Sequence, residues 1–157
     1  YPVLQSSSAQ PEYHLRRDIN GKWRMAGSLF FQADCQPQSR NLVVFGHNMT
    51  DGTMFGSLPD YHQEVFRKEH ETIILQTIDT VYVYQVIAVL ETDTAKIPFN
   101  RTSFANDADF LAFEESLLES SVFANGHVPA SEDRLLTLVT CSYAWDGARY
   151  VVVAVRE

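Results

Sequence analysis

"TLVTCSYAWDGARYVVVAVRE" forms residues 137–157, and this stretch decides how the chain is expected to fold. The apolar and β-branched run over residues 135–139 predicts a buried strand, and residues 149–155 predict a second strand that pairs with it. Two polar, reactive side chains interrupt the apolar pattern between these runs. Cys141 and Arg149 are therefore expected at the two mouths of a hairpin.

The loop of this hairpin has two possible widths. A tight two-residue turn centred on Asp146 and Gly147 would place Ala144 opposite Arg149, with Cys141 three residues further along. A wider loop would set Cys141 directly opposite Arg149. The spacing of the residues is compatible with both arrangements.

Length and composition indicate one globular domain over residues 1–157, because 157 residues that are 45% hydrophobic can bury a substantial core. The formal net charge is −8 and no Lys/Arg run is present, which excludes the basic surface of a nucleic-acid binder or of a protein bound to anionic membranes. No segment has the pattern of a transmembrane helix or a signal peptide. A polypeptide, carbohydrate or small-molecule partner is favoured.

Further strands are predicted upstream of the hairpin by runs of β-branched and aromatic residues. These runs cover residues 1–5, 26–33, 41–45, 71–78 and 80–92. Most of them are apolar on both faces, so both faces of the sheet should be covered, either by closure into a barrel or by other elements. The sequence thus predicts a mainly β fold, a small β-barrel with two or more peripheral helices.

Two helices are predicted outside the sheet. The first lies near Tyr61, with Asp60 as its N-cap, and the second begins at Asp107 as N-cap and has an apolar face. Acidic residues of the second helix, Glu114 among them, are expected on a solvent-exposed face. The histidines at positions 14, 62, 70 and 127 are expected at the surface rather than as metal ligands, and no metal or cofactor site is predicted.

Three side chains at predicted strand ends could act together in catalysis: His47, Cys141 and Arg149. A cysteine can serve as nucleophile, a histidine as acid and base, and an arginine can stabilise an oxyanion, which together make a complete set for acyl transfer. The alternative for Cys141 is a buried structural thiol. Cys35 and Cys141 could also form one disulfide.

Two motifs resemble those of the sortases, in particular the class B sortases. The family's cysteine motif, Thr-Leu-x-Thr-Cys, is matched by residues 137–141, and an arginine follows in the next strand. Its histidine segment, an aromatic residue, Gly and His followed by Thr-Met-Phe, is matched by residues 45–47 and 53–55. The stretches "YPVLQ", "AGSLF" and "FNRTSFANDADFLAF" also look like this class, so the resemblance covers nearly the whole chain in the right order.

The resemblance implies a closed eight-stranded sortase-type β-barrel and an extracellular cysteine transpeptidase that needs no cofactor. Such enzymes cleave a C-terminal sorting signal after a threonine and hold the protein as a thioacyl-enzyme. They then pass it to an amine acceptor, either of the cell-wall peptidoglycan or of a pilin lysine. By this resemblance Cys141 is the nucleophile, His47 the acid and base, and Arg149 the group that stabilises the oxyanion together with the backbone N–H of Ser142. A membrane anchor is expected upstream of Tyr1.

The resemblance also implies which residues contact the sorting signal. These are Leu15, Phe45, Phe99, Asn100, Val139 and Thr140. Val139 departs from the class, which usually has a serine there, and loss of that hydroxyl removes a hydrogen bond worth ~1 kcal/mol. The resemblance therefore implies an Asn-Pro-x-Thr-type signal but does not define its exact sequence.

Two other functions remain open at this point. The same three residues could serve a cysteine hydrolase in which water replaces the amine, or the chain could be a catalytically silent peptide-binding module. The choice between wall anchoring and pilin polymerisation also stays open.

Overall fold

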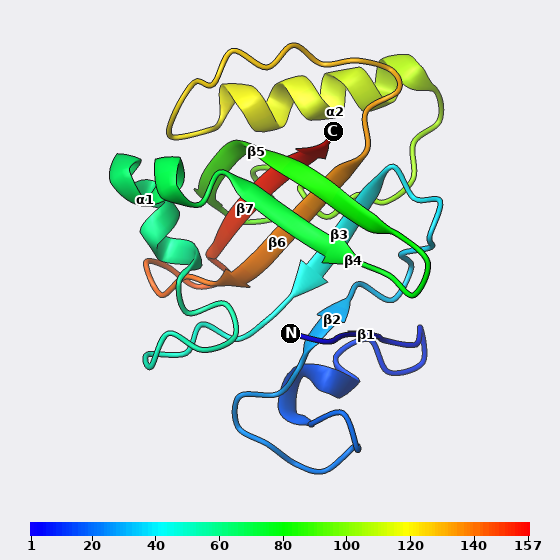
Figure 1. Cartoon of the computed structure of the whole chain (residues 1–157), viewed down its shortest axis with the longest axis vertical. Helices are drawn as coiled ribbons and strands as arrows, with labels where there is room; N and C mark the ends of the chain where they lie inside the picture. Colours follow the sequence, from blue (N-terminus) through cyan, green and yellow to red (C-terminus); the bar gives the residue numbers. More distant parts are fainter.

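The computed structural model describes residues 1–157 and consists of one curled seven-stranded sheet with a few helices (Figure 1). The strands are β1 (Val3–Gln5), β2 (Leu29–Phe31), β3 (Asn41–Phe45), β4 (Thr72–Gln76), β5 (Val81–Thr92), β6 (Leu135–Cys141) and β7 (Arg149–Arg156). The helices are η1 (Tyr13–Arg16), η2 (Leu58–His62), α1 (Glu64–Glu69) and α2 (Asp107–Glu119). Each predicted strand is therefore present, and the mainly β expectation is confirmed.

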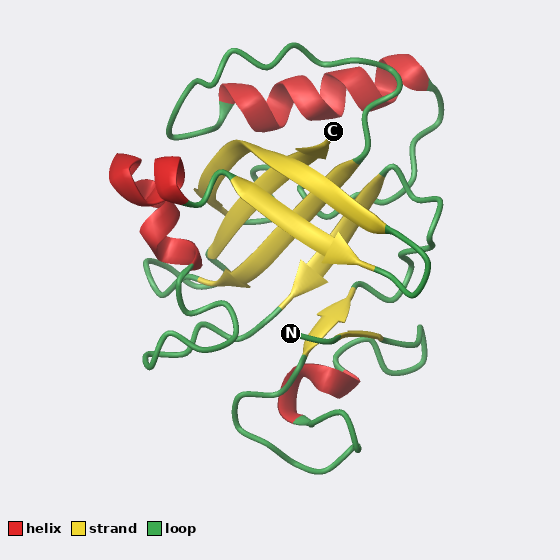
Figure 2. Ribbon diagram, viewed as in Figure 1, coloured by secondary structure: helices red, strands yellow, loops and turns green.

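The order of the strands across the sheet is β1-β2-β3-β6-β7-β5-β4 (Figure 2). Two neighbouring pairs, β1 with β2 and β3 with β6, run parallel, and the other four are antiparallel. The parallel pair of β3 and β6 joins segments that are about a hundred residues apart in the chain. Because parallel strands point the same way, the residues that follow β3 and the last residues of β6 meet at one end of the sheet.

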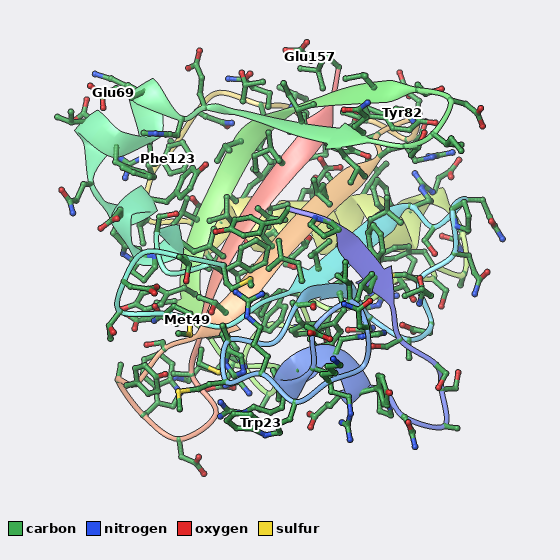
Figure 3. All side chains as sticks on the ribbon, turned by 60° about the horizontal axis from the view of Figure 1, so that its bottom comes forward. Trp23, Met49, Glu69, Tyr82, Phe123 and Glu157 are labelled. Carbon is green, nitrogen blue, oxygen red and sulfur yellow. The ribbon has the colours of Figure 1, made fainter.

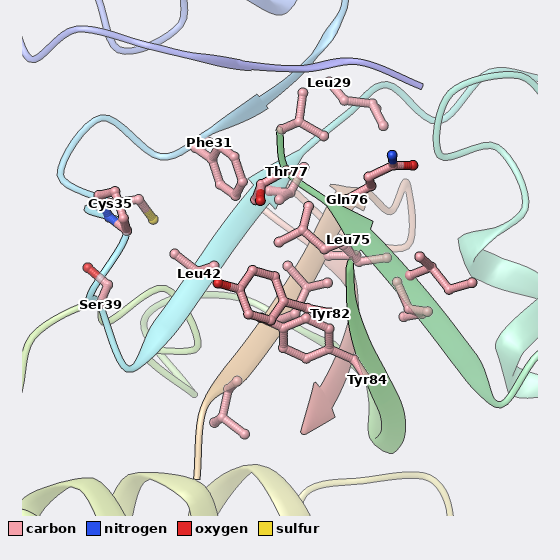
Figure 4. A pocket seen from close by; sticks show the side chains of 18 of the residues that line it. Leu29, Phe31, Cys35, Ser39, Leu42, Leu75, Gln76, Thr77, Tyr82 and Tyr84 are labelled. Atoms are coloured by element: carbon pink, nitrogen blue, oxygen red, sulfur yellow. The ribbon is translucent and has the colours of Figure 1, made fainter. Parts of the chain in front are cut away.

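The expected mainly β barrel is present as a curled half-barrel, and the expectation of eight strands and full closure overstates it, because the sheet has seven strands and stays open. Its outermost strands, β1 and β4, each pair with a single neighbour. A cavity of about 720 Å³ lies between the two ends of the curled sheet, with Leu29 and Leu42 on one side and Leu75, Tyr82 and Tyr84 on the other (Figure 4). Strand β1 has three residues and pairs with β2 alone, so it ends the sheet on this side.

Both faces of the sheet are covered, as the two-sided apolar strands predicted. Strand β7 shows this directly, because Val151 and Val153 belong to one hydrophobic cluster and Val152 and Ala154 to the other. Helix α2 lies across the first face and contributes Phe110, Phe113 and Leu117 to that cluster (Figure 1). On the second face the cluster includes Phe55, Leu58 and Tyr61 from the segment around η2.

The helices begin at other residues than the sequence indicated. Asp60 lies inside η2, and α1 follows with Gln63 as its N-cap, so Asp60 caps neither. Helix α2 is capped by Asn106, whose Oδ1 accepts a hydrogen bond of 3.0 Å from the Asp109 N–H. Asn and Asp are equally good caps, and at adjacent positions the sequence does not distinguish them. No helix in the structure combines the length and the apolar character needed to cross a membrane.

Candidate active site

The hairpin of β6 and β7 has the wider of the two possible loops. Cys141 is directly paired with Arg149 across the two strands, and residues 142–148 form the loop. Gly147 has a φ of +81°, a left-handed conformation that glycine adopts without steric cost. The Asp146-Gly147 dipeptide thus forms a hydrogen-bonded turn inside a longer loop, in which the Ala148 N–H donates to the Trp145 carbonyl at 3.2 Å, and the two strands are not joined by these two residues alone.

The parallel pairing of β3 with β6 brings the histidine segment to the same end. Phe45 is paired with Val139, and the Gly46 N–H donates to the Val139 carbonyl at 3.1 Å. Just beyond, the Asn48 side-chain amide donates to the Cys141 carbonyl at 3.0 Å. His47 therefore lies between two residues that are bonded to the end of β6. Figure 3 shows the loop that carries Met49 at the end of the sheet where β6 and β7 are joined.

The ring of His47 is fixed by the segment that contains η1. Its Nε2 lies 2.7 Å from the Leu15 carbonyl oxygen. A carbonyl can only accept a hydrogen bond, so Nε2 carries the proton and Nδ1 is the nitrogen that can gain or lose one. Burial lowers the pKa of His47 below its ordinary value; the bond to Leu15 opposes this shift, and the positive charge of Arg16 adds to it.

Arg149 and Ser142 share one backbone acceptor. The Arg149 Nη1 donates to the Ala148 carbonyl at 2.8 Å, and the Ser142 N–H donates to the same oxygen at 2.9 Å. The Ser142 N–H would therefore have to leave or share this bond in order to stabilise an oxyanion. The side chains of Cys141, His47 and Arg149 lie at one end of the sheet, but no hydrogen bond or ion pair connects them with one another.

The residues expected to contact a substrate fall into two groups. Phe45 and Asn100 are partly exposed, as is Leu15, which holds His47 through its carbonyl oxygen. Phe99 and Val139 are at most 1% exposed and belong to the hydrophobic cluster beneath α2, so their side chains offer no surface to a peptide in this structure. The substrate contacts of these five residues stay predictions.

Thr140, also expected beside the substrate, is buried at the end of β6, and its substrate contact stays a prediction. Its Oγ1 donates to the Gly46 carbonyl at 2.7 Å, so the hydroxyl ties the end of β6 to the residue before His47. This bond joins the cysteine and histidine segments directly. A threonine in the middle of a β-rich motif gives no sign that its partner lies 94 residues away.

Two further residues at the site gave no signal in the sequence. Glu91 on β5 accepts a hydrogen bond from the Ser142 Oγ, and Asp93 accepts one of 2.9 Å from the indole N–H of Trp145. Lys96 Nζ also lies 4.1 Å from the centre of the Trp145 ring. These contacts hold the first residue and the middle of the β6–β7 loop to the end of β5 and the residues that follow it. Only the sheet order, which places β5 beside β7, brings them within reach.

The two cysteines have different environments and are not joined. Both are free thiols, which excludes the disulfide that the sequence allowed. Cys35 is 3% exposed, and its Sγ lies against the backbone of Val43, accepting from the N–H at 3.3 Å. Burial raises the pKa of the Cys35 thiol. Cys141 is partly exposed, so of the two it is the thiol that a substrate can reach.

The structure thus brings a cysteine, the arginine paired with it and a histidine segment together at one end of a curled, half-barrel sheet. The model of the sortase domain family matches residues 2–157, and the chain belongs to this family. It is 33% identical over 158 residues to sortase B of Staphylococcus aureus, an alignment that covers 98% of this chain and 64% of that protein. The chain thus spans slightly less than two thirds of the length of this relative.

Solved structures agree with the class B resemblance. The sortase B–substrate complex of Staphylococcus aureus superposes with a TM-score of 0.90 at 31% identity, covering 100% of this chain and 73% of that one. A crystal structure of sortase B complexed with triglycine superposes with a TM-score of 0.88 at 32% identity, covering 100% and 74%. The expected likeness to class B sortases is confirmed.

Proposed function

We propose that this chain is the catalytic part of a cysteine transpeptidase, with Cys141 as the nucleophile. The direct pairing of Cys141 with Arg149 carries this proposal, because it places a reachable thiol beside a permanent cation. The register of β3 against β6 supports it further by adding His47 to the same end of the sheet. Membership of the sortase family supports the class of reaction.

The reaction has two acyl-transfer steps. The Cys141 thiol gives its proton to His47, its sulfur attacks the carbonyl carbon of a threonine in the sorting signal, and the guanidinium of Arg149 stabilises the oxyanion that forms. The peptide C–N bond then breaks, and His47 gives a proton to the leaving amine. An amine acceptor attacks the resulting thioester, loses a proton to His47, and releases the product with the thiolate restored.

The substrate is proposed to be a surface protein with an Asn-Pro-x-Thr-like sorting signal. A related sortase B has been solved with its substrate and another with triglycine, and these support a peptide donor and an amine acceptor for this chain. The acceptor is an amine of peptidoglycan or a pilin lysine. The enzyme would act at the extracellular face of the membrane, held by an anchor outside residues 1–157.

The direct test is a cleavage assay with a library of fluorogenic sorting-signal peptides, in the presence and absence of an amine acceptor such as triglycine. Mass spectrometry should find cleavage after threonine, with the amine joined to the new carboxyl end. The Cys141→Ala variant should be inactive on every peptide. A Cys35→Ala variant is the matched control and should keep its activity, because Cys35 is buried away from the site.

The same assay separates the alternatives. A hydrolase would release the free acid at the same rate with and without the amine. A silent binding module would cleave nothing, and its Cys141 would react with an alkylating reagent no faster than a model thiol. Cleavage that survives in the Cys141→Ala variant contradicts the proposed nucleophile.

A further inference from the structure

Three side chains with metal-binding atoms converge under α2, far from Cys141 along β6. They are Glu114 of α2, His127 of the segment after α2, and Asp133 just before β6. The His127 Nε2 lies 2.9 Å from the Glu114 Oε1 and 3.2 Å from the Asp133 Oδ2. One ligand atom from each residue lies within 4.8 Å of the other two.

Glu114 and His127 are less exposed in this cluster than the sequence predicted. Glu114 was expected on a solvated acidic face, but its side chain is 0% exposed, and His127 and Asp133 are 18% and 13% exposed. The sequence placed Glu114 at helical spacing with apolar residues, and the structure follows that spacing: Glu114 faces inward with Phe110 and Leu117. His127 was expected at the surface and is partly covered instead.

One polar atom of this cluster has no hydrogen-bond partner within the protein. The Glu114 Oε2 is buried and has no hydrogen-bond partner. An unsatisfied buried carboxylate oxygen is costly, and two carboxylates that share one imidazole repel each other. Burial raises the pKa of Glu114 to about 7; the bond to His127 opposes this, and the nearby Asp133 charge adds to it. No lysine or arginine forms an ion pair with either carboxylate.

We propose that Glu114, His127 and Asp133 form a binding site for a divalent transition-metal ion of the Zn²⁺ type. A dication would balance the two carboxylates and compensate the buried carboxylate of Glu114, whose Oε2 has no hydrogen-bond partner. The distances of 2.9 and 3.2 Å from the imidazole nitrogen to the two oxygens approach the roughly 3.3 Å between ligand atoms around a tetrahedral zinc ion.

The type of ligand favours zinc over calcium. One imidazole nitrogen with two carboxylates suits Zn²⁺ and its first-row neighbours, whereas Ca²⁺ takes six to eight oxygen ligands. Three protein ligands leave one position for water, and the partial exposure of His127 and Asp133 gives solvent a path to it.

The metal would have a structural role. It would join α2 to the segment that leads into β6, the strand that ends at Cys141 (Figure 1). The two sites lie at opposite ends of β6, since Asp133 precedes the strand and Cys141 ends it. The ion would therefore stabilise the packing of α2 on the sheet, and it would not contact the reacting groups.

The test is calorimetric titration of Zn²⁺ into tag-free protein stripped with a chelator, in a Cys141→Ala background that removes the exposed thiol. The parent should bind one ion per chain, and its thermal unfolding temperature should rise with added Zn²⁺. Glu114→Gln and His127→Gln should each weaken binding at least about 10-fold and abolish the rise. Glu115→Gln is the matched control, since Glu115 is the exposed neighbour of Glu114, and it should bind as the parent does.

The absence of zinc binding in the parent would overturn the proposal. So would binding of equal strength in the His127→Gln variant, which would mark an ion held elsewhere on the acidic surface. Because His127 is partly exposed, this variant remains informative if Glu114→Gln does not fold. The outcome does not depend on transpeptidase activity, so it is independent of the proposed function.

Discussion

At the level of single residues, the Leu15 carbonyl determines how His47 can act. It fixes the proton on Nε2 and leaves Nδ1 as the exchanging nitrogen. The lowered pKa means that His47 binds a proton less readily in the folded chain than in the unfolded one. This contribution destabilises the fold as the pH falls from about 6.5 toward the folded pKa, and it vanishes above that range.

Arg16 is expected to be one cause of this lowered pKa. Its positive charge disfavours the imidazolium, so Arg16→Gln should raise the pKa of His47 toward the ordinary value. The shift can be followed by an NMR titration of the His47 ring. Arg17→Gln is the control, because Arg17 is the neighbouring arginine, it bonds the Tyr13 carbonyl, and it is not among the groups that shift the pKa of His47. Equal shifts in both variants would exclude the charge of Arg16 as the cause.

The guanidinium of Arg149 should matter for the reaction rate more than for stability. Arg149→Ala should lower kcat/KM by about 10²–10³-fold, the usual loss when an oxyanion donor is removed. Arg149→Lys should recover only part of it, since an ammonium keeps the charge but loses the planar fork. Arg156→Ala, at the other end of β7, should leave kcat/KM unchanged. A fully active Arg149→Ala enzyme would show that the arginine has no part in catalysis.

At the level of elements, the register of β3 against β6 builds the site, and two buried threonines make this testable. The Thr140 Oγ1 donates to Gly46 near Cys141, and the Thr137 Oγ1 donates to the Asn41 Oδ1 toward the other end, both at 2.7 Å. Replacing either by valine should cost about 1–3 kcal/mol, because a buried acceptor loses its donor. Chemical denaturation measures this cost.

The two valine variants should differ in activity although they are similar in stability. Thr140→Val releases Gly46, the residue before His47, so kcat/KM should fall well beyond the change in Thr137→Val. Comparable activities in the two would mean that the Thr140 bond supports the fold alone.

Strands and helices that arise from local sequence patterns were predictable. Continuous β-branched runs predicted β3, β6 and β7 at or within two residues of their bounds. The N-cap of α2 was misplaced by one residue because Asn106 and Asp107 are both good caps. The width of the β6–β7 loop was open, since Asp146-Gly147 suits a bend in either loop. The partners of Thr140 and Ser142 come from other strands and leave no local signal.

At the level of the whole molecule, closure of the sheet could not be predicted either. Two-sided apolar strands require cover on both faces, and a closed barrel and a helix-covered open sheet both provide it. The cysteine and histidine motifs predicted that Cys141 and His47 lie at the same site, because these motifs resemble those of the sortases. The burial of Glu114 was not predicted, because acidic side chains usually face solvent. Its helical spacing from Phe110 and Leu117 nevertheless puts it on the apolar face of α2.

The cover provided by α2 should contribute strongly to global stability. Leu117 is 0% exposed within the cluster beneath the helix, so Leu117→Ala should lower the free energy of unfolding by about 2–5 kcal/mol. Leu118→Ala should cost less, because Leu118 is only partly buried against the same cluster. Urea denaturation of the two variants checks this order, and a larger loss for Leu118→Ala would contradict the packing described for α2.

Acylation of Cys141 during the reaction is tested most directly by intact-protein mass spectrometry. The enzyme is mixed with a sorting-signal peptide without an amine acceptor and quenched in acid to preserve a thioester. We predict a mass increase equal to the peptide fragment ending in threonine minus one water, located at Cys141 by digestion and absent in Cys141→Ala. A cleaved peptide without this adduct, or an adduct on another residue, would show that Cys141 is not the nucleophile.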